Sequence, residues 1–66
     1  MHVYEKIKIY MDKHGLDQDV IANRAGIDKD TFSLLMKGDK VLNAEELREI
    51  CISLNVSPEL FFETID

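Results

Sequence analysis

Side chains that could support catalysis, redox chemistry or metal binding are few in this sequence, and their spacing favours none of these activities. Cys51 is the only cysteine and lies on an apolar helical stripe, so a buried structural thiol is a simpler interpretation than a redox sensor. His2 and His14 have no cysteine or carboxylate at metal-ligand spacing, which predicts surface positions and no metal site. The acidic segment 45–49 is typical of a solvated helix face, because a catalytic carboxylate pair needs a pocket that 66 residues can hardly enclose.

Loops that cradle the phosphates of a nucleotide cofactor are also missing from the sequence. The three glycines, Gly15, Gly26 and Gly38, fit neither G-x-G-x-x-G nor G-K-[ST], and their positions suit the ends of helices. We therefore expect no cofactor, no small-molecule substrate and no enzymatic activity.

The length and composition predict one small acidic globular domain over residues 1–66. The chain carries 8 Lys and Arg against 13 Asp and Glu, a net charge of −5, and 45% of its residues are hydrophobic. That acidity argues against nonspecific binding to nucleic acid or to a membrane surface. No apolar run approaches the ~20 residues that span a bilayer, the first residues lack a secretory pattern, and a single cysteine suits a reducing compartment. We expect a cytoplasmic protein without a membrane partner.

Apolar residues recur at intervals of three and four, which predicts an all-α fold. Five helices are expected at about 3–14, 18–25, 29–37, 44–54 and 58–63. At four of the predicted helix starts, a polar capping residue directly follows one apolar residue, and a second apolar residue lies four positions after the capping residue. This spacing is typical of a hydrophobic staple. These capping residues are Asp17, Asp28, Asn43 and Ser57. The three glycines and Asn55 suit the left-handed position after the first four helices.

The second and third predicted helices are the most informative pair. Only the segment Gly26-Ile27-Asp28 separates them, and a three-residue connection that contains glycine makes two short helices cross steeply. Ala22 and Ala25 are small enough to let the helices approach closely. The segment from about 17 to 37 is therefore predicted to be a helix-turn-helix.

Three segments, in order and at matching spacing, carry a family resemblance. Residues 16–27 read LDQDVIANRAGI, residues 31–33 and 37–38 read TFS and KG, and residues 54–62 read LNVSPELFF. They are similar to the patterns L-T-Q-x-x-L-A-x-x-A-G-[VI], T-I-S with [RK]-G, and L-G-V-S-x-D-x-L-F. These patterns belong to the phage repressor/Cro-like, or XRE-type, helix-turn-helix domains. The resemblance runs from Leu16 to Phe62 and implies a compact five-helix, lambda-repressor-like fold.

The resemblance also implies a DNA-binding mode, in which the third helix lies in the major groove and the second crosses the phosphate backbone. The residues implied as DNA contacts are Gln18, Asn23, Lys29, Asp30, Thr31, Ser33, Leu34, Lys37 and Lys40. The first two would contact the backbone, Lys37 and Lys40 would contact phosphates beyond the helix, and the others would reach bases or phosphates. Dimers of the family read two half-sites about one helical turn apart, which implies a homodimer on a two-fold operator in double-stranded DNA.

The third helix departs from the family at several positions. Asp30 can accept from cytosine N4 and Leu34 can contact a thymine methyl, yet neither makes the bidentate contact of Arg or Gln. Met36 stands where Glu is common in the family. Residues 16–40 carry a net charge of −1 and residues 41–66 one of −5, so we expect the acidity to lie mainly away from a nearly neutral DNA face. This balance predicts modest affinity and a shallow salt dependence.

The last predicted helix contains two adjacent aromatic residues, Phe61 and Phe62. The staple spacing from Val56 places Phe61 inward and leaves Phe62 exposed, and an exposed aromatic residue indicates a partner surface. We expect self-association through this helix, with Phe61 and Phe62 at the dimer interface; packing of both rings in the core is the alternative. Tyr4 and Tyr10 are expected to lie half-buried at the edge of the core.

Two functions remain open from the sequence. The first is a sequence-specific DNA-binding transcriptional regulator, a small prophage, plasmid or bacterial repressor that blocks polymerase by occupying DNA. The alternative is a protein-interaction module that keeps the fold but binds DNA weakly or not at all. In that case a partner helix would dock on an acidic and apolar face formed by Asp28, Asp30, Leu34 and Met36.

Overall fold

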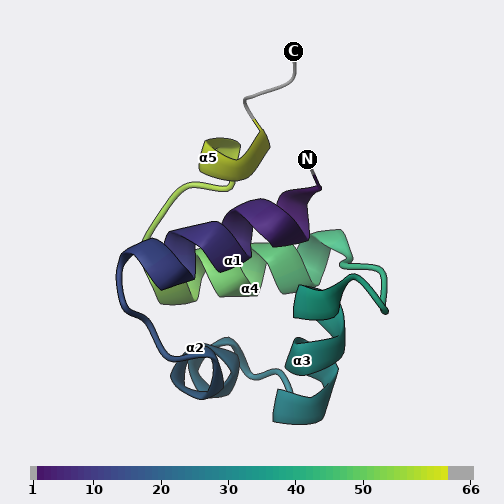
Figure 1. Ribbon diagram of the computed structural model, residues 1–66. Coiled ribbons are helices and arrows are strands. Elements are labelled where there is room, and N and C mark those ends of the chain that lie inside the picture. The colour runs from purple at the N-terminus through teal and green to yellow at the C-terminus, as the bar shows by residue number, and fades with distance from the viewer. Residues whose placement is uncertain (1, 63–66) are drawn as a thin grey trace.

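The computed structural model describes the backbone of residues 2–62 and the side chains of residues 2–61. This part of the chain folds into five helices without a strand, as the sequence predicts (Figure 1). The helices are α1 (Val3–Lys13), α2 (Gln18–Ala25), α3 (Lys29–Lys37), α4 (Ala44–Leu54) and α5 (Glu59–Phe62). The end of α1 and the start of α5 each differ by one residue from the prediction, because His14 leaves helical geometry at φ −99° and ψ 8° and Pro58 lies in the turn before α5. The predicted end of the last helix, residue 63, lies outside the described residues. None of these helices is long and apolar enough to cross a membrane.

Side-chain caps start three of the helices at the predicted residues, and the fourth predicted residue, Ser57, accepts a hydrogen bond from the Glu59 N–H at 3.3 Å before α5. Asp17 and Asp28 each accept a hydrogen bond from the backbone N–H two residues ahead, at 2.8 and 3.1 Å. Asn43 Oδ1 accepts from the Glu46 N–H at 2.7 Å, and Glu46 Oε1 accepts from the Asn43 N–H at 3.1 Å, which completes a capping box. Each cap contributes about 1 kcal/mol to the stability of its helix.

The turn between α2 and α3 has the compact geometry that the sequence predicts. Gly26 ends α2 in the left-handed region at φ 72°, and the Ile27 N–H donates to the Ala22 carbonyl at 2.9 Å. Asp28 then caps α3. In Figure 1, α2 is seen nearly along its axis while α3 lies across the view, so the two helices cross steeply. Ala22 and Ala25 are both buried, as close approach of the helices requires.

One cluster of buried apolar side chains joins all five helices. Its members are Ile7, Met11, Ile21, Ala22, Ala25, Phe32, Leu35, Met36, Leu47, Ile50, Cys51, Leu54 and Phe61. Tyr4 and Tyr10 pack half-buried against this core, as predicted. The residues expected to flank the helix caps differ in burial, since Ile27 and Val56 pack against the core whereas Leu16 remains 37% exposed.

Phe61 attaches α5 to α1. Its side chain is 2% exposed, and its ring meets Tyr10 edge to face with the centroids 5.9 Å apart. The Lys6 ammonium donates to the Phe61 carbonyl oxygen at 3.1 Å. Phe61 thus packs inward, as the staple spacing predicts, and this burial argues against its prediction as a contact with a second copy. The side chain of Phe62, the other residue of the predicted dimer interface, lies outside the described residues.

The contact between Tyr4 and Gly38 leads to a prediction about stability. A Cβ atom at Gly38 would lie 2.5 Å from the Tyr4 ring, whereas one at Gly15 would meet nothing within 4 Å, and both glycines have left-handed backbones. Either substitution by alanine has a backbone cost of about 1–2 kcal/mol. Only Gly38→Ala must also displace the tyrosine ring, at an added cost of about 1–3 kcal/mol. Urea denaturation should therefore show Gly38→Ala to be less stable than Gly15→Ala.

The double substitution Tyr4→Ala/Gly38→Ala is the control. Because the ring is then gone, Gly38→Ala should cost less free energy in the Tyr4→Ala background than in the wild-type protein. Equal costs for the alanine at positions 15 and 38 would show that the tyrosine ring does not constrain the end of α3.

Candidate nucleic-acid interface

One face of α3 is turned outward, while the opposite face is anchored in the core. The buried residues of the helix are Phe32, Leu35 and Met36, each at most 2% exposed. With successive residues about 100° apart around the axis, the direction opposite to these three passes close to Asp30. Leu34 and Lys37 follow Asp30 by four and seven positions, and all three are exposed. They form the central row of the outward face of α3.

The other residues predicted as DNA contacts lie at varied distances from this central row. Of the full predicted set, the exposed members are Asn23, Lys29, Asp30, Leu34, Lys37 and Lys40, and the half-buried members are Gln18, Thr31 and Ser33. Lys29 and Ser33 flank the central row on one side. Thr31 turns to the other side and lines a pocket against α4. Gln18 is the first residue of α2 and Asn23 lies in its last turn, so α3 alone brings six of the nine together.

The structure corrects the proposed docking face for a partner helix. Met36 is 2% exposed, so the interpretation that it belongs to an exposed face is wrong. The Asp28 carboxylate accepts from the Asp30 and Thr31 N–H groups at 3.1 and 3.4 Å, which engages it as a cap. Of the four residues that suggested such a face, Asp30 and Leu34 are still available to a partner, and Leu34 is 42% exposed.

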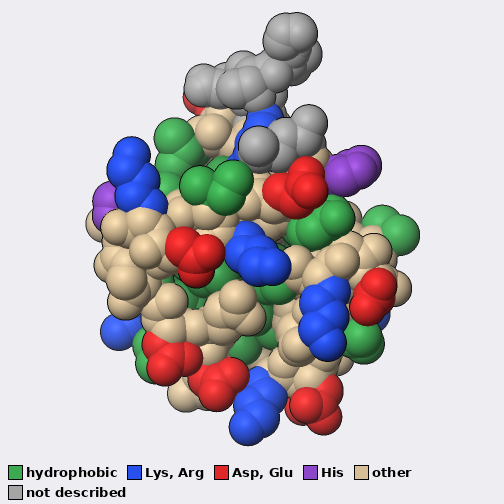
Figure 2. Space-filling model, in the orientation of Figure 1, with side chains coloured by type: hydrophobic (Ala, Val, Ile, Leu, Met, Phe, Trp, Pro, Cys, Tyr) green, Lys and Arg blue, Asp and Glu red, His purple; other side chains and the backbone are tan. Residues whose placement is uncertain are grey.

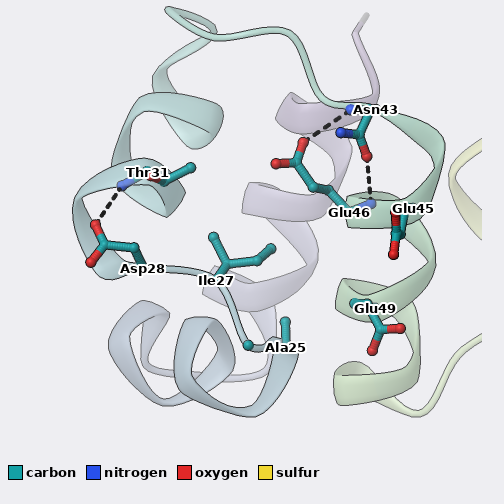
Figure 3. Close-up of a pocket in the computed structure, with 9 residues that line it drawn as sticks. Ala25, Ile27, Asp28, Thr31, Asn43, Glu45, Glu46 and Glu49 are labelled. Carbon is teal, nitrogen blue, oxygen red and sulfur yellow. Dashed lines mark hydrogen bonds between the residues drawn. The ribbon is translucent and has the colours of Figure 1, made fainter.

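A pocket of about 380 Å³ lies between the turn before α3 and the first turns of α4 (Figure 3). Its lining includes the carboxylates of Asp28, Glu45, Glu46 and Glu49 and contains no Lys or Arg, so it does not suit a phosphate group. The acidic residues of α4 therefore border the start of α3, which corrects the expectation that this acidity lies away from the DNA face. Within residues 2–61, no group of three His, Cys, Asp or Glu side chains is placed to hold a metal ion.

A second groove, near the end of α3, contains basic as well as acidic side chains. Lys37 shares a groove of about 440 Å³ with Lys8 of α1, although Glu5 and Asp12 also line it. Lys8 is not among the residues that the sequence predicts as DNA contacts. Its proximity to Lys37 follows from the packing of α1 on α3, a long-range contact that local spacing does not reveal.

The cations of the α3 face differ in their existing partners. The Lys40 ammonium lies 3.9 Å from the carboxylate of the half-buried Glu46, a long ion pair near the surface that contributes about 0–1 kcal/mol. Neither Lys29 nor Lys37 forms an ion pair with any other described residue. Figure 2 shows acidic and basic side chains interspersed over the visible face, without a continuous basic area. Such a surface would neutralise few phosphates, and modest affinity stays a prediction.

The steep turn between α2 and α3 and the outward face of α3 define the class of this protein, a helix-turn-helix DNA-binding domain. The profile of the Cro/C1-type helix-turn-helix DNA-binding domains matches residues 6–66, and the chain belongs to this family. The family consists of DNA-binding domains and not of enzymes, in agreement with the sequence interpretation. Comparisons with curated proteins and with solved structures give no match.

The buried thiol of Cys51 provides a test of its structural role. Its side chain is 1% exposed, and burial raises the pKa of the thiol, so less of it is the reactive thiolate at neutral pH. We expect iodoacetamide to alkylate the folded protein at least about a hundredfold more slowly than the urea-unfolded chain, because a domain of this size unfolds only rarely. Mass spectrometry at several times would measure both rates. Rapid alkylation of the folded protein would instead favour the redox-sensor interpretation.

Proposed function

We propose that this protein is a sequence-specific transcriptional regulator that represses by occupying its operator with α3 in the major groove. The observation that carries this proposal is the exposed row of Asp30, Leu34 and Lys37 on a helix whose other face is anchored in the core. An α-helix with its side chains is about 10–12 Å across, which suits a major groove about 12 Å wide. Membership of the family supports DNA as the partner.

The residues around α3 have distinct roles in this proposal. Gln18, at the first position of α2, contacts a phosphate together with backbone N–H groups of the helix start, and Asn23 makes a second backbone contact. Lys29, Thr31 and Ser33 contact phosphates or bases on either side of the central row. Lys37 and Lys40 contact phosphates beyond the helix, and the Lys40 ammonium exchanges Glu46 for a phosphate.

We also propose that the protein acts in the cytoplasm as a homodimer on a two-fold operator, because a single α3 of nine residues covers only a few base pairs. The symmetry of the dimer would place two copies of α3 about one helical turn of DNA apart. Phe62 remains the proposed contact between the copies, since Phe61 is used in the core of each.

The substitution Lys37→Ala tests the phosphate contact. We expect it to weaken binding to all sequences about equally and to reduce the slope of log K against log salt by about 1 per protomer, because one phosphate contact is lost. Fluorescence anisotropy over a salt series would measure both quantities. Lys13→Ala is the matched control, since it removes the same charge from the exposed end of α1. Equal effects of the two substitutions would indicate that only net charge matters and would contradict the proposed contact.

Selection of bound duplexes from a random pool, combined with analytical ultracentrifugation, tests specificity and symmetry together. We expect an enriched consensus with two-fold symmetry and half-site centres about 10 base pairs apart, bound by two protomers. A consensus without symmetry, bound by one protomer, would contradict the dimer. No binding to any duplex at low salt would contradict the proposed function and favour the interaction module.

A further inference from the structure

The central row of α3 carries an inference about which bases the protein selects, and this inference rests on the proposed function. We infer that Asp30 selects cytosine in the major groove and that Leu34 selects a thymine within two base pairs of it. The assignment depends on where these two side chains lie on the helix and on the chemistry of their tips.

Asp30 has the most central position on the outward face. Its direction is opposite to the buried face formed by Phe32, Leu35 and Met36, and it lies in the first turn of α3. In helix-turn-helix complexes the first residues of this helix reach base edges. The backbone N–H of Asp30 donates to Asp28, which fixes its place at the helix start while its own side chain stays exposed.

The carboxylate of Asp30 restricts the base it can meet. An ionised carboxylate only accepts hydrogen bonds, and cytosine offers an N4 donor in the major groove. Guanine presents only the acceptors N7 and O6 there, and thymine presents the acceptor O4, so both would repel the carboxylate. Adenine offers a donor at N6 but also an acceptor at N7 beside it. The acceptor-only chemistry of Asp30 therefore favours cytosine.

Leu34 lies one turn further along the same row and is 42% exposed, whereas the other leucine of the helix, Leu35, is fully buried. Its apolar tip has no hydrogen-bonding group, and the thymine C5-methyl is the apolar group that the major groove presents. Four helical residues rise by about 6 Å, which is less than two base-pair steps of about 3.4 Å. The two selected bases therefore lie close together in each half-site.

The flanking charges make the approach of a carboxylate to DNA feasible. Lys29 precedes Asp30 and Lys37 ends the row, and neither is paired with a carboxylate among residues 2–61. Both ammonium groups can therefore reach the phosphates on the two sides of the groove. They offset the repulsion of Asp30 without contributing to base selection.

The experiment compares the duplexes selected from a random pool by the wild-type protein, Asp30→Asn and Asp39→Asn. Asn makes a bidentate pair with adenine N6 and N7, so Asp30→Asn should change one cytosine of each half-site to adenine, with a shift in preference of about fivefold or more. Asp39→Asn removes the same charge outside α3 and should leave the consensus unchanged. Circular dichroism of each variant checks that the helices remain folded.

Replacement of the selected thymine by uracil tests Leu34, because it removes only the methyl group. The wild-type protein should bind the uracil duplex about threefold more weakly, and Leu34→Ala should bind the two duplexes equally. If the wild-type protein selects a consensus that Asp30→Asn leaves unchanged, or if uracil has no effect, the inference is overturned while the proposed function stands. If the wild-type protein binds all duplexes equally, the proposed specificity itself fails.

Discussion

The direction in which α3 faces depends on the burial of Phe32 directly after a three-residue turn. Gly26 closes α2 and Asp28 caps α3, so the turn fixes where the helix begins. Phe32, one turn further on, is 1% exposed and fixes which side of the helix faces inward. A core of this size supplies about 3–5 kcal/mol, and the loss of a buried phenylalanine costs a similar amount. The outward face of α3 therefore exists only when the whole domain is folded.

The far end of α3 is held by a different contact. Tyr4 of α1 lies against Gly38, where the chain leaves α3 in a left-handed conformation, and the Tyr4 ring leaves no room there for a side chain. Tyr4 is half-buried and packs against the core, so α1 limits the movement of the last turn of α3. The helix is thus fixed at its start by the turn and at its end by an element from the beginning of the chain. Both constraints act on the side chains that would meet DNA.

Local interactions explain which features could be predicted from the sequence. The starts of α2, α3 and α4 match the prediction because Asp17, Asp28 and Asn43 accept from N–H groups only two or three residues away. The prediction that Met36 is exposed is wrong. Met36 follows Phe32 by four positions, and this spacing places both side chains on the buried side of α3. The contact of Tyr4 with Gly38 and the proximity of Lys8 to Lys37 depend on how helices pack, and local spacing contains no information about either. The acidic border of the turn was missed for the same reason.

The distribution of charge determines how such a domain can discriminate between DNA sequences. Asp17 and Asp28 interact with positive helix ends, yet Glu45 and Glu49 of α4 border the start of α3 and oppose the approach of phosphates there. Binding to arbitrary DNA depends on neutralised phosphates, and this surface neutralises few of them. In the proposed dimer, discrimination would come from contacts with bases and from the simultaneous binding of two half-sites. A face with few unpaired cations limits the competition from nonspecific DNA, so the proposed specificity would depend on a small number of base contacts.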